Sequence, residues 1–217
     1  KEIIAKYDLS VYMPERIISF LNEGAEGVRP ETPKPDDKVF DKTFNFLIGN
    51  NKIALEAAEK KSVELKINAE IINDRLEGDI SIISQYIVGT SLKYQSDINA
   101  PKPLCLIFGG EPTVKVTGNG KGGRNQHLAL VCSALLRGHK GITMLSAGTD
   151  GNDGPTSAAG AVVDCDTYGD AVLQGIIPEE YLRNFDSFNF FRKAGGHIIT
   201  GPTMTNVMDI IVVIIES

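Results

Sequence analysis

The sequence has few cysteines, and none is spaced for a disulfide framework or a zinc site. The three cysteines, each inside an apolar run, are Cys105, Cys132 and Cys165. An odd number of isolated thiols without a CxxC pair is typical of a reduced protein. The three histidines show no metal-ligand spacing either. A reduced, cytoplasmic protein is therefore expected.

The sequence also lacks a membrane-length apolar segment and an excess of positive charge. The apolar run Ile210–Ile215 has only the length of a strand. Acidic residues number 28 against 22 basic ones, for a net charge of -6. No basic stretch is interleaved with aromatic residues, as single-stranded nucleic-acid binding requires. Neither a membrane nor a nucleic acid is an expected partner.

Hydrophobic residues make up 42% and charged residues 23% of the 217 residues, which suits one large globular domain with an extra arm. Pro14–Leu21 predicts a short helix, and the proline- and glycine-rich stretch Gly24–Lys42 is typical of a linker. Residues 1–42 are therefore expected to form a linker helix and a proline-rich connection. Residues 43–217 are expected to form the α/β domain.

Strand and helix patterns alternate along that domain. Strands are expected at Phe44–Gly49, Leu65–Ile72, Leu104–Phe108, Thr113–Thr117, Ile142–Ala147, Gly160–Asp164 and Ile210–Ile215. Helices are expected after Asn50 or Asn51, after Asp79, at Arg124–Arg137, and in two parts over residues 167–194. The alternation predicts an α/β layered sandwich, with a largely parallel or mixed sheet flanked by helices.

Glycines and polar residues gather where the expected strands end. The stretches are Gly109–Glu111, Gly118–Gln126, Gly148–Gly154 and Gly201–Asn206. Loops that leave the carboxyl ends of strands are where α/β proteins bind ligands. These four stretches are therefore expected to form the site.

Gly118–Gly123 matches the pattern GxGxxG between an expected strand and an expected helix. Such glycines and a helix N-terminus suit an oxyanion or a phosphate. The acidic residue of a dinucleotide site is absent some twenty positions later, and no Lys-Ser or Lys-Thr follows as in a P-loop. A phosphate cradle of another kind is predicted, with a ligand-free hairpin turn as the alternative.

Three charged residues in these stretches suit a site for an anionic substrate, one as a cation and two as carboxylates that can hold Mg²⁺. Arg124 opens a helix, where a cation is unfavourable unless it forms a forked pair with a carboxylate or phosphate. The alternative is a structural ion pair with Glu111 or Asp150. Asp150 and Asp153 are expected to hold Mg²⁺, with ordinary Asx turns as the alternative. No Ser-His-Asp order or nucleophile elbow occurs, so we expect phosphoryl transfer by positioning and charge stabilisation.

Four ordered motifs resemble the C-terminal MOFRL domain of class II glycerate kinases. They are Gly109–Val114, Gly122–Gln126, Ser146–Thr156 and Thr200–Asp209, and Thr32–Pro35 and Ile48–Asn51 also match. The resemblance covers about residue 30 to the end. Family members are ATP- and Mg²⁺-dependent glycerate 2-kinases, so it implies transfer of the ATP γ-phosphoryl group to the 2-hydroxyl of D-glycerate.

The resemblance also implies partners and residue roles. Family members carry a further N-terminal α/β domain, so this chain is expected to be half of such an enzyme, weak or inactive alone, with a homodimer as a further arrangement to consider. Arg124 and Asp150 would be catalytic, and Asp150 and Asp153 would bind the metal. The substrate- or phosphate-binding residues would be Gly109, Gly110, Glu111, Gly120, Gly122, Gly123, Asn125, Gln126, Asp153, Thr203 and Asn206.

Two other functions stay open at this point. A hydroxypyruvate reductase would need a nicotinamide site, which the missing acidic residue argues against. A non-catalytic anion-binding domain would use the same glycine-rich loops without chemistry.

The departures from the family pattern at Gly78–Ser81, His127 and Met208 concern substrate contacts more than the fold.

Overall fold

The computed structural model describes residues 1–216 and contains two compact units, Lys1–Leu47 and Ile48–Ser217. The first unit contains α1 (Glu2–Lys6), η1 (Leu9–Val11), α2 (Glu15–Ala25) and η2 (Lys38–Phe40). None of its side chains is buried. Helix α2 confirms the helix expected over Pro14–Leu21, and Pro14 directly precedes its first residue.

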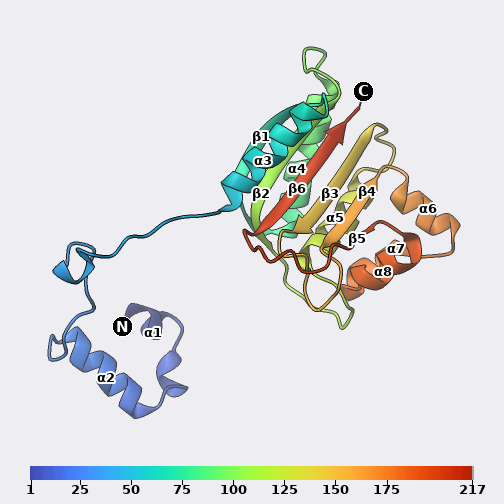
Figure 1. The fold of residues 1–217 in the computed structure, drawn as a ribbon. Helices are drawn as coiled ribbons and strands as arrows, with labels where there is room; N and C mark the ends of the chain where they lie inside the picture. The colour runs from blue at the N-terminus through green and yellow to red at the C-terminus, as the bar shows by residue number, and fades with distance from the viewer. Residues whose placement is uncertain (217) are drawn as a thin grey trace. The chain divides into compact units, whose positions relative to one another are not determined.

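A six-stranded sheet forms the centre of the second unit (Figure 1). The strands are β1 (Asn68–Asp79), β2 (Leu104–Thr113), β3 (Ile142–Gly148), β4 (Gly160–Asp164), β5 (His197–Ile198) and β6 (Asp209–Ile215), in the order β1-β2-β6-β3-β4-β5. Strands β1 and β2 are parallel and the other neighbours are antiparallel. The mixed α/β fold is confirmed. A largely parallel sheet is not found, because β6 inserts antiparallel between β2 and β3.

Helices cover both faces of the sheet (Figure 1). They are α3 (Asn51–Glu64), α4 (Ile80–Ser96), α5 (Arg124–Leu135), α6 (Thr167–Leu173), α7 (Pro178–Asn184) and α8 (Ser187–Ala194). Strand β2 shows the two-sided burial that a continuous apolar run predicts: Leu106 and Phe108 belong to the core under α4 and α5, whereas Cys105 and Ile107 pack with Leu55 of α3. Helix α4 links the parallel strands β1 and β2.

Polar side chains begin two of these helices as expected. Asn50 accepts a hydrogen bond from the Ile53 amide at 2.9 Å, and Asp79 accepts one from the Ser81 amide at 2.8 Å. Each side chain therefore satisfies an otherwise unpaired donor of the first helical turn.

The strand expected at Phe44–Gly49 is wrong. The segment forms no strand, and Phe44, Phe46 and Ile48 are exposed. An apolar run becomes a strand only when a neighbouring strand completes its hydrogen bonds, and the sheet begins instead with β1. The strand–helix–strand unit expected around α3 is therefore absent.

The separate strand expected at Thr113–Thr117 is also wrong. Strand β2 continues through Gly109 and Gly110 to Thr113, and no strand follows directly. Gly110 has a φ of +143°, and a Cβ there would overlap the backbone of Leu76 in β1. Gly110 therefore allows close contact inside the sheet, and neither glycine ends the strand.

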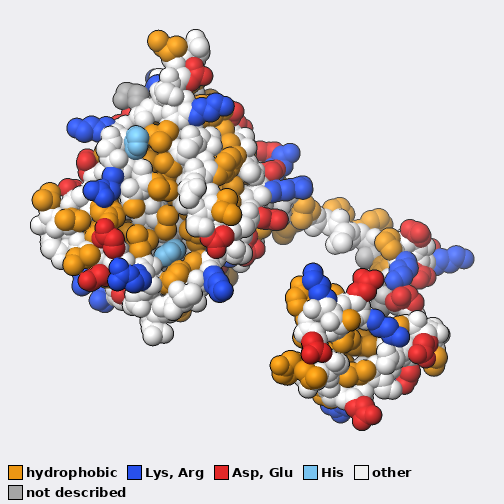
Figure 2. Space-filling model, turned by 180° about the vertical axis from the view of Figure 1, so that it is seen from behind, with side chains coloured by type: hydrophobic (Ala, Val, Ile, Leu, Met, Phe, Trp, Pro, Cys, Tyr) orange, Lys and Arg blue, Asp and Glu red, His pale blue; other side chains and the backbone are white. Residues whose placement is uncertain are grey.

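Figure 2 shows the second unit from the side covered by α4 and α5, where apolar side chains lie among charged ones. Ile82 and Tyr86 of α4 and Leu135 of α5 are among the exposed apolar residues. Among residues 1–216, no helix has both the length and the apolar character that spanning a bilayer requires.

Replacing Leu55 should test how α3 is held on the sheet. Leu55 is fully buried, so Leu55→Ala should lower the free energy of unfolding by about 3 kcal/mol, measured by urea denaturation. The matched control is Ile53→Ala on the same helix, whose side chain is 47% exposed and should lose less than about 1 kcal/mol. Equal losses at the two positions would contradict this packing.

Candidate functional site

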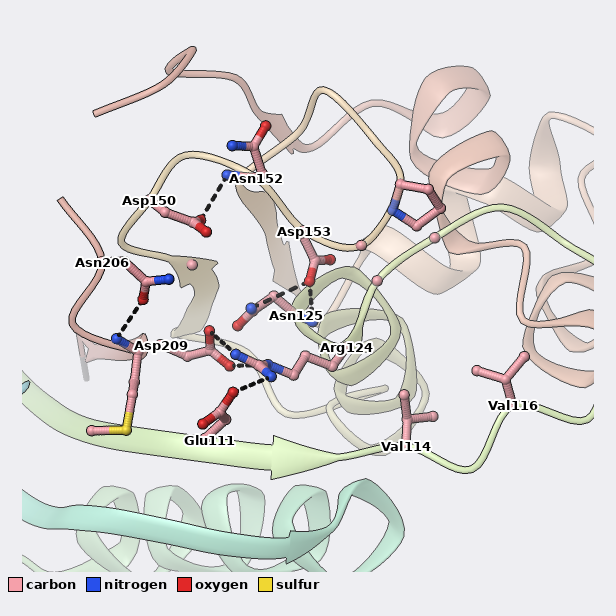
Figure 3. Close-up of a pocket in the computed structure, with 16 residues that line it drawn as sticks. Glu111, Val114, Val116, Arg124, Asn125, Asp150, Asn152, Asp153, Asn206 and Asp209 are labelled. Atoms are coloured by element: carbon pink, nitrogen blue, oxygen red, sulfur yellow. Dashed lines mark hydrogen bonds and ion pairs between the residues drawn. The ribbon is translucent and has the colours of Figure 1, made fainter. Parts of the chain in front are cut away.

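A cavity of about 570 Å³ lies where β2, α5, the loop after β3 and the loop before β6 meet (Figure 3). The sheet order creates it, because Asp209 at the start of β6 pairs with Gly110 of β2 and with Gly148 of β3. The lining residues are Glu111, Val114, Val116, Gly122, Gly123, Arg124, Asn125, Gly148, Asp150, Asn152, Asp153, Gly154, Pro155, Asn206, Met208 and Asp209. Residues from all four predicted stretches therefore meet in one place, with Glu111 from the first and Asn206 from the fourth.

Arg124 lies between two carboxylates in this cavity (Figure 3). Its Nε donates to Asp209 Oδ2 at 2.6 Å, its Nη2 to Asp209 Oδ1 at 3.1 Å, and its Nη1 to Glu111 Oε1 at 2.8 Å. The Asp209 side chain is 2% exposed, whereas those of Arg124 and Glu111 are 33% and 55% exposed. The hydrogen bond to Asp209 is the main reason why the pKa of Arg124 is raised. The guanidinium is therefore a fixed cation that faces the cavity.

The structural ion pair between Arg124 and Glu111, which was the alternative to a ligand contact, is present. The other expected partner, Asp150, forms no ion pair with Arg124 among the described residues. Sequence reasoning missed Asp209, the stronger partner. The sequence feature that could have indicated Asp209 is its position as a carboxylate directly before a buried apolar run, where an unpaired charge is costly.

Asp153 binds the N-terminus of α5. Its Oδ1 accepts from the Asn125 amide at 3.0 Å, and its Oδ2 accepts from the Gln126 amide at 2.8 Å and from Gln126 Nε2 at 2.9 Å. Burial raises the pKa of Asp153, and these hydrogen bonds oppose that rise. The anion expected at this helix N-terminus is therefore supplied by the chain itself.

Asp150 lines the same cavity in a different setting (Figure 3). Its Oδ1 accepts a hydrogen bond from the Asn152 amide at 2.9 Å, which is the Asx turn that the Asp-Gly-Asn sequence suggested as an alternative. Asp150 is only half-buried, so its carboxylate can also meet a ligand.

The loop after β3 is tied to the loop before β6. The Thr149 hydroxyl donates to the carbonyl of Met208 at 2.7 Å and accepts from the Val207 amide at 2.9 Å. The Thr203 amide donates to the Asp150 carbonyl at 3.1 Å. Thr203 therefore supports the position of Asp150 from outside the cavity lining.

The first glycines of Gly118–Gly123 pack against protein. The Gly120 amide donates to the Asn184 carbonyl at 2.8 Å, and a Cβ at Gly118 or Gly120 would overlap Asn184. Gly122 and Gly123 alone of these glycines line the cavity. Gly118 and Gly120 therefore serve the contact with the end of α7, whereas Gly122 and Gly123 pack against Ser187 and Asp153.

Eight of the predicted residues line the cavity and five do not. Glu111, Gly122, Gly123, Arg124, Asn125, Asp150, Asp153 and Asn206 line it, whereas Gly109, Gly110, Gly120, Gln126 and Thr203 lie outside. Gly110 instead lines a neighbouring cavity of about 520 Å³ formed with residues 74–78 of β1. Arg124 and Glu111 border both cavities.

No cluster of three or more His, Cys, Asp or Glu side chains within residues 1–216 is arranged to hold a metal. The two carboxylates expected to hold Mg²⁺, Asp150 and Asp153, both line the cavity.

His127 of α5 lies apart from the cavity lining. Its ring stacks on Phe185 with centroids 4.6 Å apart, and its Nδ1 is buried without a hydrogen-bond partner in the described chain. Burial lowers the pKa of His127, and the charge of Asp79 opposes this shift. The folded protein therefore favours the neutral imidazole.

Comparison with known proteins places these residues in a family. Residues 104–209 match the MOFRL family. A D-glycerate 2-kinase from Thermotoga maritima is 41% identical over 191 residues, which are 88% of this chain and 46% of that protein. A glycerate 2-kinase from Pyrococcus horikoshii is 36% identical over 220 residues, covering 100% of this chain and 49% of that protein. The chain thus spans about half the length of these relatives.

A solved structure of a glycerate kinase from Thermotoga maritima has the same fold. It superposes with a TM-score of 0.75 at 44% identity, over 78% of this chain and 41% of that one. The mixed sheet and its flanking helices are therefore shared with that protein.

The two aspartates of the loop after β3 should differ in their effect on stability. Asp153→Ala leaves the first amides of α5 unpaired and should lower the free energy of unfolding by about 2 kcal/mol. Asp150→Ala removes only an exposed turn bond and should cost less than about 1 kcal/mol in the same denaturation assay. A larger loss for Asp150→Ala would overturn this assignment.

His127 should make stability depend on pH. Because its pKa is lower in the folded state, the folded protein binds fewer protons than the unfolded one, and stability rises with pH. The contribution is complete above the ordinary imidazole pKa of about 6.5 and is lost as the pH falls below it.

In His127→Phe, the free energy of unfolding should fall less between pH 7.5 and 5 than in the parent protein. The exposed His139 provides the control, since His139→Gln should keep the parent dependence. His197, whose pKa is also lowered by burial, stays in both variants and keeps part of the slope. An unchanged slope in His127→Phe would contradict the burial of a neutral ring.

Proposed function

We propose that this chain, whose residues 104–209 belong to the MOFRL family, forms part of the active site of a glycerate 2-kinase. The reaction would transfer the γ-phosphoryl group of ATP to the 2-hydroxyl of D-glycerate. The observation that carries the proposal is the fixed guanidinium of Arg124, oriented by buried Asp209 toward a cavity of about 570 Å³. The names of two relatives at 41% and 36% identity support the reaction.

Arg124 is suited to phosphoryl transfer because that reaction depends on positioning and on charge stabilisation. Asp209 accepts hydrogen bonds from Nε and Nη2 along one edge of the guanidinium, and these two bonds keep its plane fixed. Glu111 accepts from Nη1 with an exposed carboxylate, so an incoming anion can replace Glu111 at this nitrogen. Arg124 would then bind the phosphoryl group or the carboxylate of D-glycerate through a forked pair.

Asp150 is the residue that fits a magnesium ion. Mg²⁺ is commonly held by one or two carboxylates together with phosphate oxygens, and Asp150 offers one partly exposed carboxylate in the cavity. Both oxygens of Asp153 already accept hydrogen bonds from α5, so we assign Asp153 to the helix instead. Bound Mg²⁺ would offset the negative charge of the phosphates.

The remaining lining suits a phosphate chain. Gly122, Gly123 and Gly154 contribute backbone to the cavity wall, and Asn152 and Asn206 add amide groups. Arg124 also lines the neighbouring cavity, through which the smaller substrate, D-glycerate, could reach its guanidinium.

Half of the relatives' length lies outside the match, and we propose that the N-terminal domain of the family completes the site. That domain is the expected partner of the cavity's open side. The isolated thiols support a cytoplasmic location.

The two alternatives receive less support. A nicotinamide-dependent reductase would use the glycines of Gly118–Gly123 for its cofactor, whereas Gly118 and Gly120 pack against Asn184. A non-catalytic anion-binding domain predicts that Arg124 contributes nothing to turnover, which the following experiment tests.

Replacing Arg124 should abolish most of the activity in a coupled ADP-release assay with D-glycerate, ATP and Mg²⁺ on the full-length protein. Arg124→Ala should lower kcat/KM by about 10²–10³-fold, the usual cost of removing one charge-stabilising donor. Arg124→Lys keeps the charge but cannot form the fork, so it should recover only part of this loss.

The control is Arg137→Ala, just beyond the other end of α5, where the guanidinium lies over Tyr168 instead of in the cavity. Its kcat/KM should stay near the parent value. Unchanged turnover in Arg124→Ala would contradict the proposed role. A parent protein that neither binds nor turns over the two substrates would contradict the kinase function itself.

A further inference from the structure

Asn51, the first residue of α3, reaches the backbone that leads into β6. Its Nδ2 donates to the Val207 carbonyl at 2.7 Å and to the Asp209 carbonyl at 2.9 Å. The residue is 2% exposed and lines neither of the two cavities that Arg124 borders. Asn51 therefore contacts the site only through the main chain.

Gly109 makes this reach possible. A Cβ at Gly109 would overlap Asn51 Oδ1 and crowd Leu55 of α3. Gly109 is not a positive-φ residue, so its lack of a side chain matters here for space rather than for backbone conformation. The glycine that the sequence suggested as a ligand contact instead accommodates Asn51.

The backbone held by Asn51 needs such support. Met208 lies between the two acceptor carbonyls and has a φ of +68°, which is uncommon for a residue with a side chain. Strand pairing begins only at Asp209, opposite Gly110 and Gly148. Two hydrogen bonds from one buried amide therefore hold the backbone on either side of Met208, together with the bonds from Thr149.

We propose that Asn51 is a positioning residue for Arg124, acting through the backbone of residues 207–209 and the carboxylate of Asp209. The inference rests on the proposed kinase function for its kinetic consequence. The order of contacts is Asn51 to the Asp209 main chain, then the Asp209 carboxylate to the Arg124 guanidinium. Without the amide of Asn51, the guanidinium loses its fixed orientation while keeping its charge.

The neighbouring Asn50 provides a matched control. Its Oδ1 caps α3 by accepting from the Ile53 amide, and its loss should cost about 1 kcal/mol of stability. Asn50 forms no hydrogen bond with residues 207–209 in the described chain. Asn50→Ala therefore weakens the same helix without touching the route to Arg124.

The kinetic test is a double-mutant cycle on the full-length protein. Asn51→Ala should lower kcat/KM for D-glycerate by about tenfold or more, whereas Asn50→Ala should stay within about twofold. Asn51→Ala combined with Asp209→Asn should be little worse than Asp209→Asn alone, because both act on one contact route. Asn50→Ala combined with Asp209→Asn should instead be additive.

An NMR measurement tests the same route without turnover. The Nε–H resonance of Arg124 can be assigned by its loss in Arg124→Lys, and it reports the 2.6 Å hydrogen bond to Asp209. Asn51→Ala should shift or broaden this resonance, and Asn50→Ala should leave it in place. If Asn51→Ala does not fold, Asn51→Ser and Gly109→Ala replace it, since the first shortens the donor and the second displaces it.

The outcomes separate this inference from the kinase function. If the parent protein phosphorylates D-glycerate while the Asn51 variants keep its kcat/KM and the Arg124 resonance, the positioning role is wrong and the kinase function stands. Additive effects of Asn51→Ala and Asp209→Asn would also overturn the positioning role. If the parent protein does not phosphorylate D-glycerate, the kinase function is wrong and the resonance alone decides the role of Asn51.

Discussion

The ion pair between Asp209 and Arg124 is the interaction on which the site depends. A carboxylate with 2% of its side chain exposed is costly unless a cation and hydrogen bonds compensate it, and the two bonds from Arg124 do so. The same pair allows a cation to stand at the start of α5, where the helix dipole disfavours it. Because Asp209 begins β6 and Arg124 begins α5, the pair joins the centre of the sheet to the helix that covers it.

Three carboxylates near Arg124 have different surroundings, which determine what each can do. Asp153 is buried with both oxygens on α5, so it stabilises the helix. Asp209 is buried against the guanidinium and orients it. Glu111 is exposed and makes a single bond to Arg124, so it is the contact that an anionic ligand can displace most easily.

Local patterns predicted much of the fold and part of the site. Gly160–Asp164, the Asp79 cap and the start of α5 at Arg124 followed from periodicity and capping, and the glycine-rich stretches indicated where ligand groups gather. Strand order is not encoded in periodicity, so the antiparallel insertion of β6 was missed, and with it the role of Asp209. The same limit hid Asn51, whose acceptors lie 156 and 158 residues away. Gly118 and Gly120 suggested a ligand contact but pack against Asn184, because close packing and ligand approach both require glycine.

The most direct test of this account is a crystal structure of the full-length protein with D-glycerate and a non-hydrolysable ATP analogue. The account predicts that Arg124 keeps both hydrogen bonds to Asp209, gives up Glu111, and turns that side of the guanidinium to a phosphate or carboxylate oxygen. Ligands bound elsewhere, with Arg124 still paired to Glu111 as well as to Asp209, would contradict it.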